Sequence, residues 1–155
     1  MTISLSIHPD RRLAFFRFHG NVDTRQGVEV FERYIASPEF SSEFKMLTDT
    51  SDLETVETGY RSMLSSILGL RRSLRTFQTP VRSVIYARSD VFFGLARILE
   101  QIQNPMSKIS IVVTRDEAEA LRLAGQPERS MTAFKKAVSQ CQSEKSERRG
   151  GTRRL

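Results

Sequence analysis

The chain has 155 residues, 39% of them hydrophobic, which is the size of one ordinary domain with a single packed core and excludes two large domains. Its formal charge of +6 is unevenly distributed, because residues 10–57 carry −4 and residues 60–99 carry +6. The lone Cys141 excludes an internal disulfide and is typical of a cytoplasmic protein. We expect neither a signal peptide nor a transmembrane segment, since no apolar run approaches about 18 residues.

The first two predicted elements form an antiparallel hairpin. Residues 2–8 alternate between polar and apolar side chains, residues 9–12 make a turn, and residues 13–18 resume an apolar run. A register that pairs His8 with Leu13 puts six apolar side chains on one face of the sheet: Ile3, Leu5, Ile7, Ala14, Phe16 and Phe18. Leu13 and Phe15 then point to the other face. The second strand is therefore expected inside the sheet and the first strand nearer its edge.

Helices and strands alternate after the hairpin. Asp23 and Gln26 have capping-box spacing for a helix that ends near Pro38, and a strand follows over residues 44–50. The pattern then predicts a long helix over 60–77, a strand over 81–87, a helix from a Ser89 cap to Ile102, a strand over 109–113, and a short helix opened by residues 114–117. This order predicts an α/β fold, a mixed, mostly parallel five-stranded sheet with an N-terminal antiparallel hairpin and four to five helices.

The end of the chain differs in composition from the predicted domain over residues 1–125. An added helix is predicted over residues 126–140, through Met131, Phe134 and Val138. Residues 141–155 are polar and basic and include Gly150 and Gly151. This composition predicts a disordered tail.

Four segments carry a family resemblance: residues 18–22 after the hairpin, 47–50 at a strand end, 86–97, and 113–121. Their order and spacing, over about residues 3–125, resemble the SpoIIAA-like branch of the STAS fold. The resemblance implies a small cytoplasmic protein of regulatory function, related in fold to the lipid-binding Sec14 domains.

The resemblance also implies a modification site. Antagonists of this fold carry an Asp-Ser pair before the second long helix, and phosphorylation of that serine controls binding to a kinase-like anti-sigma factor. Glu57 and Thr58 occupy the equivalent place here, so Thr58 is the implied phosphoacceptor, with Arg61 one turn away. The alternative is that Thr58 or Thr55 merely caps the helix.

The sequence contains no motif of a catalytic site. It lacks G-x-S-x-G, H-E-x-x-H, a Gly-rich phosphate loop and Cys-x-x-Cys, so we expect no enzyme activity, no cofactor and no metal. His8 and His19 fall on different strands of the hairpin and are expected at the surface. Four acids gather where a parallel strand ends: Asp49, Asp52, Glu54 and Glu57. They could hold Mg²⁺, but the interpretation we favour is a solvated loop offset by arginines.

An arginine-rich stretch indicates a partner surface. Residues 60–99 hold seven arginines and one acid, Asp90. The predicted basic face comprises Arg61, Arg71, Arg72, Arg75 and Arg88. Because the chain has one acidic and one basic part, it can pair with a protein partner or with itself. Specific nucleic-acid binding is not expected, since the stretch has no lysine and no recognition motif is present.

The predicted helix over residues 91–102 is apolar on more than its core face. One stripe consists of Val91, Leu95, Ile98 and Ile102, and further apolar side chains widen it. Its cover could be the C-terminal helix around Met131 and Phe134, a second subunit, or an apolar ligand. The predicted interface or ligand pocket comprises Tyr60, Met63, Leu64, Ile67, Phe92, Phe93 and Leu99.

The sequence therefore favours a non-enzymatic regulatory or interaction module that binds a protein partner of unknown identity or forms a homodimer. The second hypothesis is a small carrier of a lipid or another apolar ligand. The third is an anti-sigma-factor antagonist switched by phosphorylation of Thr58.

Overall fold

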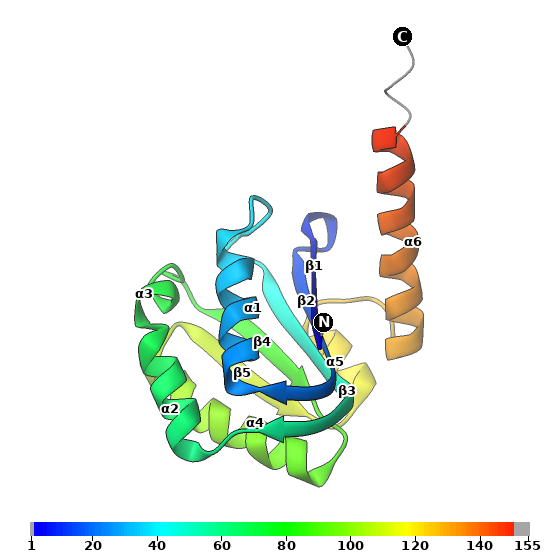
Figure 1. Cartoon of the computed structure of the whole chain (residues 1–155). Coiled ribbons are helices and arrows are strands. Elements are labelled where there is room, and N and C mark those ends of the chain that lie inside the picture. Colours follow the sequence, from blue (N-terminus) through cyan, green and yellow to red (C-terminus); the bar gives the residue numbers. More distant parts are fainter. Residues whose placement is uncertain (1, 151–155) are drawn as a thin grey trace.

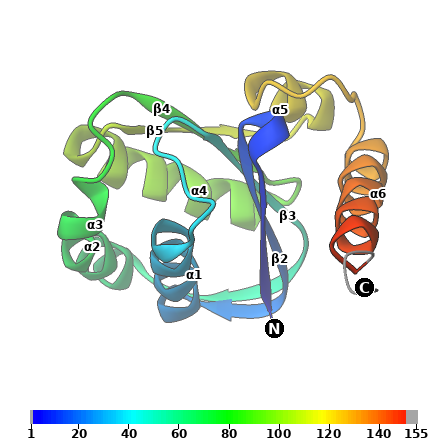
Figure 2. The same cartoon turned by 90° about the horizontal axis from the view of Figure 1, so that it is seen from above.

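The computed structural model describes residues 2–150, in which one sheet lies between two layers of helices (Figures 1 and 2). Within those residues five strands follow the order β1-β2-β3-β4-β5; β1 and β2 pair antiparallel, and the other neighbours pair parallel. The predicted fold class is confirmed. The elements are β1 (Ile3–His8), η1 (Pro9–Arg11), β2 (Leu13–Asp23), α1 (Thr24–Ala36), β3 (Lys45–Glu57), α2 (Tyr60–Gly69), α3 (Arg71–Leu74), β4 (Val81–Tyr86), α4 (Asp90–Gln103), η2 (Asn104–Met106), β5 (Ile109–Thr114), α5 (Glu117–Leu123) and α6 (Met131–Gly150).

The hairpin of β1 and β2 has the predicted register. His8 pairs with Leu13 and Ile3 pairs with Phe18, and the turn between the strands ends at Arg12 with a left-handed φ of 51°. Because side chains alternate along a strand, Phe16 joins the core beneath α1, α2 and α4, whereas Leu13 joins the core beneath α5 and α6. The prediction that the first strand lies at the sheet edge is also confirmed.

β2 and β3 extend beyond their neighbours in the sheet. β3 continues to Glu57, seven residues past the predicted end at Thr50; it pairs with β4 only as far as Asp49 and with β2 as far as Glu57. The β2–β3 register shifts twice near Gly20, whose φ of +68° favours glycine. Residues 19–23 and 52–57 thus form a two-stranded ribbon that ends where α1 begins (Figure 1).

The predicted long helix over residues 60–77 is wrong in its continuity. α2 ends at Gly69, and the short α3 follows Leu70. Glycine is a poor helix former, so a helix end at Gly69 is favourable. Phe77 lies outside the helices, is 2% exposed, and stacks on Phe31 in the core with ring centroids 6.0 Å apart. This break raises the number of α-helices within residues 2–150 to six, above the four to five expected.

The predicted apolar stripe of α4 is confirmed at Leu95, Ile98 and Ile102 and is wrong at Val91. Ser89 caps the helix as expected, with its hydroxyl accepting from the Phe92 amide at 3.1 Å. This cap sets the first turn so that Val91 is 67% exposed. The α4 side chains that pack against the core are Phe92, Leu95, Ala96, Ile98, Leu99 and Ile102.

α5 and α6 cover the opposite face of the sheet (Figure 2). Phe134 is fully buried there and meets Phe15 edge to face, with ring centroids 5.0 Å apart. Arg11 forms an ion pair with Glu128 at 2.8 Å beside this contact. The C-terminal helix therefore does not cover α4, which contradicts one of the three predicted covers.

α6 is longer than the helix predicted over residues 126–140. It begins at Met131, after the Ser130 hydroxyl accepts from the Ala133 amide at 3.1 Å, and it continues to Gly150 through residues of good helix propensity. Residues 141–150, predicted to be disordered, are thus helical, and residues 151–155 of that predicted tail lie outside the described residues. No helix within residues 2–150 has the length and apolarity needed to cross a bilayer.

His8 is buried, not at the surface as predicted. It is 2% exposed, and its Nε2 lies 2.9 Å from the Ser6 hydroxyl. Side chains alternate along β1, and Ile7 faces the core beneath α1, α2 and α4, so His8 faces the opposite side of the sheet, beneath α6. Burial is the main cause that lowers the pKa of His8; Asp10 and Glu39 oppose this shift, whereas Arg11 and Lys145 add to it.

The lowered pKa of His8 predicts a loss of stability in mild acid. As the pH falls from about 7 to about 5, the unfolded chain binds a proton at His8 before the folded chain does, so the free energy of unfolding should decrease. The His8→Gln variant should show a smaller decrease over the same range, measured by urea unfolding. Equal pH dependence of the two proteins would contradict a role for His8.

Candidate functional site: an apolar cavity on one face of the sheet

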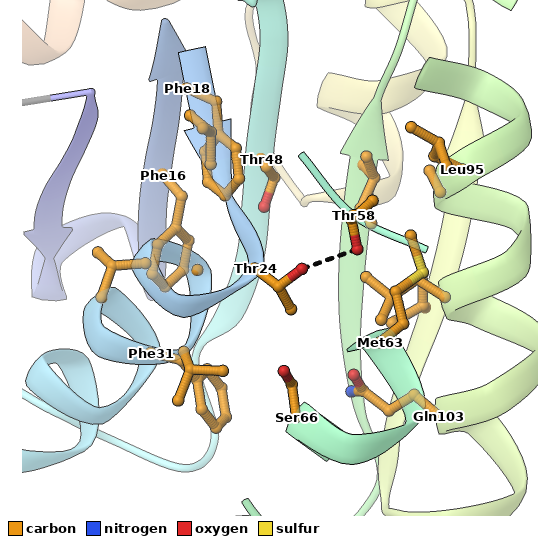
Figure 3. A pocket seen from close by; sticks show the side chains of 18 of the residues that line it. Phe16, Phe18, Thr24, Phe31, Thr48, Thr58, Met63, Ser66, Leu95 and Gln103 are labelled. Carbon is orange, nitrogen blue, oxygen red and sulfur yellow. Dashed lines mark hydrogen bonds between the residues drawn. The ribbon is translucent and has the colours of Figure 1, made fainter. Parts of the chain in front are cut away.

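A cavity of about 270 Å³ lies between the sheet and the layer formed by α1, α2 and α4. Figure 3 shows side chains from the sheet and from all three helices turned toward it. Most of the lining is apolar. Among the labelled residues are Phe16 and Phe18 of β2, Phe31 of α1, Met63 of α2 and Leu95 of α4. The cavity is thus a concave, mostly apolar site between the sheet and the helices.

Small residues on every wall explain why the space is unfilled. The central strands present Thr48 and Ser83 toward the helices, where a closed core would carry larger aliphatic side chains. The facing positions are Gly27 on α1, Ser66 on α2 and Ala96 on α4. A Cβ atom at Gly27 would meet no atom within 4 Å. Layers with small side chains on both sides leave a void between them.

The two-stranded ribbon closes one end of the cavity. Val22, Leu53 and Val56 of the ribbon belong to both the core and the cavity lining. At the same end the Thr24 hydroxyl donates to the Thr58 hydroxyl at 2.7 Å (Figure 3), which joins the first residue of α1 to the segment before α2. Nearby, Asp23 and Gln26 form the predicted capping box of α1.

The structure brings together four of the seven predicted pocket residues. Met63, Ile67, Phe92 and Leu99 line the cavity. The other three lie elsewhere: Tyr60 is 61% exposed, Leu64 packs at the edge of the core, and Phe93 lies beneath the Arg115 guanidinium, 4.3 Å from its ring centroid. Whether any of the seven contacts a ligand or a partner stays a prediction.

Sequence reasoning missed the sheet and α1 side of the cavity. The signal was present, because the alternation of β3 places Thr48 on the same face as the buried Met46. A threonine at an inward position of a central strand is a mismatch with a filled core.

Thr58 lies at the rim of the cavity and does not cap α2. The N-cap of α2 is Gly59, which makes no side-chain cap hydrogen bond, and the Thr55 hydroxyl donates to Asn21 instead. The interpretation of Thr58 or Thr55 as a simple cap is therefore wrong. Phosphorylation of Thr58 stays a prediction, and it would break the contact with Thr24.

The predicted basic face is divided between two places. Arg61, Arg71, Arg72 and Arg75 are exposed on α2, on α3 and just after α3, whereas Arg88 is exposed in the loop between β4 and α4. The role of these arginines as a partner surface stays a prediction.

Two of the predicted acidic cluster residues are paired with cations. Asp49 is fully buried, and its Oδ2 lies 2.5 Å from the Nζ of Lys135 on α6, while its Oδ1 accepts from the Ser51 amide and hydroxyl. Asp52 pairs with Arg17 at 2.8 Å, and this contact lowers the pKa of Asp52. Within the described residues, no group of three or more His, Cys, Asp or Glu side chains is arranged to hold a metal.

Solved structures that resemble this chain include the following two. One is an uncharacterized protein of the DUF3478 family with a SpoIIAA-like fold from Shewanella loihica PV-4, which is 16% identical, covers 77% of this chain and 90% of its own, and has a TM-score of 0.47. The other is the anti-sigma factor antagonist SpoIIAA in its unphosphorylated form, which is 16% identical, covers 79% of this chain and 98% of its own, and has a TM-score of 0.46. Neither a protein-family model nor a curated protein matches the sequence.

The buried pair of Asp49 and Lys135 predicts a specific pattern of stability. Lys135→Met should lower the free energy of unfolding by about 3–5 kcal/mol, because it leaves the buried carboxylate of Asp49 without a cation. The second substitution Asp49→Asn should restore most of this loss in the double variant. Urea unfolding measures both, and Lys136→Met, at an exposed position of the same helix, is the control. An equal effect of the two lysine substitutions would contradict the pairing.

Proposed function

We propose that the protein is a binding module that holds a small apolar molecule in the cavity between the sheet and α1, α2 and α4. The observation that carries this proposal is the cavity itself, about 270 Å³ of mostly apolar lining in a domain of ordinary size. The proposal corresponds to the carrier hypothesis drawn from the sequence.

The walls of the cavity favour an apolar occupant. A molecule that fills the space would bury apolar surface of the lining and gain dispersion contacts with it. Such binding would also stabilise the folded protein.

The lining also favours binding over chemistry. Its polar groups are hydroxyls, the Gln103 amide and the Asp23 carboxylate, and that carboxylate already accepts from the Gln26 amide at 2.9 Å. Hydroxyls and amides can orient a ligand by hydrogen bonds. The proposal is therefore a non-enzymatic role.

Filling the cavity should weaken ligand binding. In Gly27→Leu the added side chain enters the cavity, so the affinity for a hydrocarbon probe such as ethylbenzene should fall by about tenfold or more. The loss of a glycine inside α1 should at the same time stabilise the protein by about 0.5–1 kcal/mol. Calorimetric titration and the ligand-induced rise in the unfolding temperature measure these effects.

Gly94→Leu provides the matched control for this experiment. Gly94 is an exposed helix glycine on α4 with open space around it, and it does not line the cavity. This variant should bind ethylbenzene as the wild type does. If the two variants bind ethylbenzene equally, the cavity is not the binding site and the proposed function is wrong.

The outer face of α2 favours a second function, binding of a protein partner. Tyr60 and Leu68 are 61% and 43% exposed, and with Leu64 they follow the i, i+4, i+8 spacing of one helix stripe. The exposed arginines of α2 and α3 lie on the same segment. A partner with an apolar patch and an acidic rim would complement this surface.

Placing a charge on this stripe should weaken association. Leu68→Glu should reduce, by about tenfold, either self-association in sedimentation velocity or the capture of a partner from extracts of the source cell. Met106→Glu, at an exposed apolar residue of η2, is the control and should leave association unchanged. Equal behaviour of the two variants would remove α2 as the docking surface.

A further inference from the structure

The polar groups along the cavity divide into those with partners and those without. Thr24 and Thr58 bind each other, and the Thr50 hydroxyl donates to the Tyr86 carbonyl at 2.7 Å. Asp23 is engaged in the cap of α1. These groups serve the fold, and their hydrogen-bonding capacity is largely used.

Thr48 and Ser83 differ from these groups. They lie on the adjacent central strands β3 and β4, and no hydrogen bond of either hydroxyl is found within residues 2–150. Since Thr48 pairs with Ile85, two residues beyond Ser83, the two side chains are diagonal neighbours on one sheet face. Both are only half-buried although helices cover this face, because the cavity reaches them.

The Thr48 and Ser83 hydroxyls remain accessible from the cavity and are free to hydrogen-bond a molecule that enters it. A ligand that displaces water from these hydroxyls must replace the lost hydrogen bonds, because a polar group buried without a partner costs about 1–3 kcal/mol. Ser66 and Gln103 add donors and acceptors on the helix side, where Figure 3 shows their polar ends turned into the cavity. The cavity is thus apolar in bulk and carries hydrogen-bonding groups at set positions, which is the pattern of a site that orients its ligand.

The charge of the lining limits the ligand further. Among the lining residues, all within the described part of the chain, Asp23 alone is charged, and its carboxylate is committed to the cap of α1. An anionic ligand would therefore meet no cation, and a charged group transferred from water without a partner binds poorly. The volume of the cavity limits the size of the ligand. An apolar cavity of about 150 Å³ holds benzene, so one of about 270 Å³ has room for about ten non-hydrogen atoms.

We propose that the cavity binds an uncharged molecule of about ten non-hydrogen atoms whose hydroxyl, carbonyl or amide group hydrogen-bonds to Thr48 and Ser83. This inference rests on the proposed function of the cavity as a ligand site, and it adds the chemical class of the ligand and the residues that recognise it. The apolar remainder of the ligand lies against side chains such as Phe16, Phe31 and Leu95.

Three compounds of matched size test this proposal: ethylbenzene, 2-phenylethanol and phenylacetate. In calorimetric titrations of the wild type near neutral pH, phenylacetate should bind at least about tenfold more weakly than 2-phenylethanol. The double variant Thr48→Val/Ser83→Ala removes both hydroxyls with little change of shape. It should lose about tenfold in affinity for 2-phenylethanol relative to ethylbenzene.

Thr50→Val is the control variant, because the Thr50 hydroxyl lines the same cavity but already has a partner in Tyr86. It should leave the ratio of the 2-phenylethanol and ethylbenzene affinities unchanged, even if the protein becomes less stable. An unchanged ratio in the double variant, or equal binding of phenylacetate and 2-phenylethanol, would overturn the inference and leave the proposed function standing. Failure of all three compounds to bind would overturn both.

Discussion

The order of the strands is the constraint on which the rest of the structure depends. From β2 to β5 each strand is added beside the one before it, always in the same direction. Parallel connections are right-handed, so α1, α2 and α4 must all lie on one face of the sheet. The opposite face would stay bare without an additional element. α5 and α6 supply it, and this is why Phe134 packs on Phe15 and not on α4.

The same arrangement makes a cavity possible, because helices can stand off from a sheet only if something holds them there. Polar contacts at the helix ends do so. Asp23 caps the start of α1, and Thr24 ties that start to Thr58 before α2. At the C-terminal end of α4, the side chain of Asn104 forms two hydrogen bonds with the backbone of Ile111 in β5, at 2.8 and 3.1 Å. Collapse of the helices onto the small floor residues would break these contacts, so the layer keeps its distance.

Sequence reasoning succeeded where a pattern has one physical solution. Two alternating strands joined by a short turn allow a single register that gathers the apolar side chains, and His8 opposite Leu13 was predictable for that reason. The position of α6 was not predictable, since an apolar face through Phe134 shows that a helix is buried but not against what. The break after Gly69 depends on the burial of Phe77, a tertiary effect. For the cavity, the alternation of side chains along each strand predicts which residues point toward the helices. The void itself was not predictable, because it depends on which small residues of the sheet lie opposite small residues of α1, α2 and α4.

The burial of Asp49 beneath Lys135 has a consequence for how the chain is made. A ribosome releases β3 long before residues 131–138, so the sheet face that carries Phe15 and the Asp49 carboxylate emerges first and stays in contact with water. Before α6 packs, the Asp49 carboxylate is open to water, and a charged group on an apolar face disfavours burial of that face against another chain unless a cation accompanies it. Arrival of α6 then exchanges hydration for the ammonium group of Lys135. The Asp49 carboxylate is thus hydrated while this sheet face is uncovered, and it is paired with Lys135 inside the core once α6 has packed.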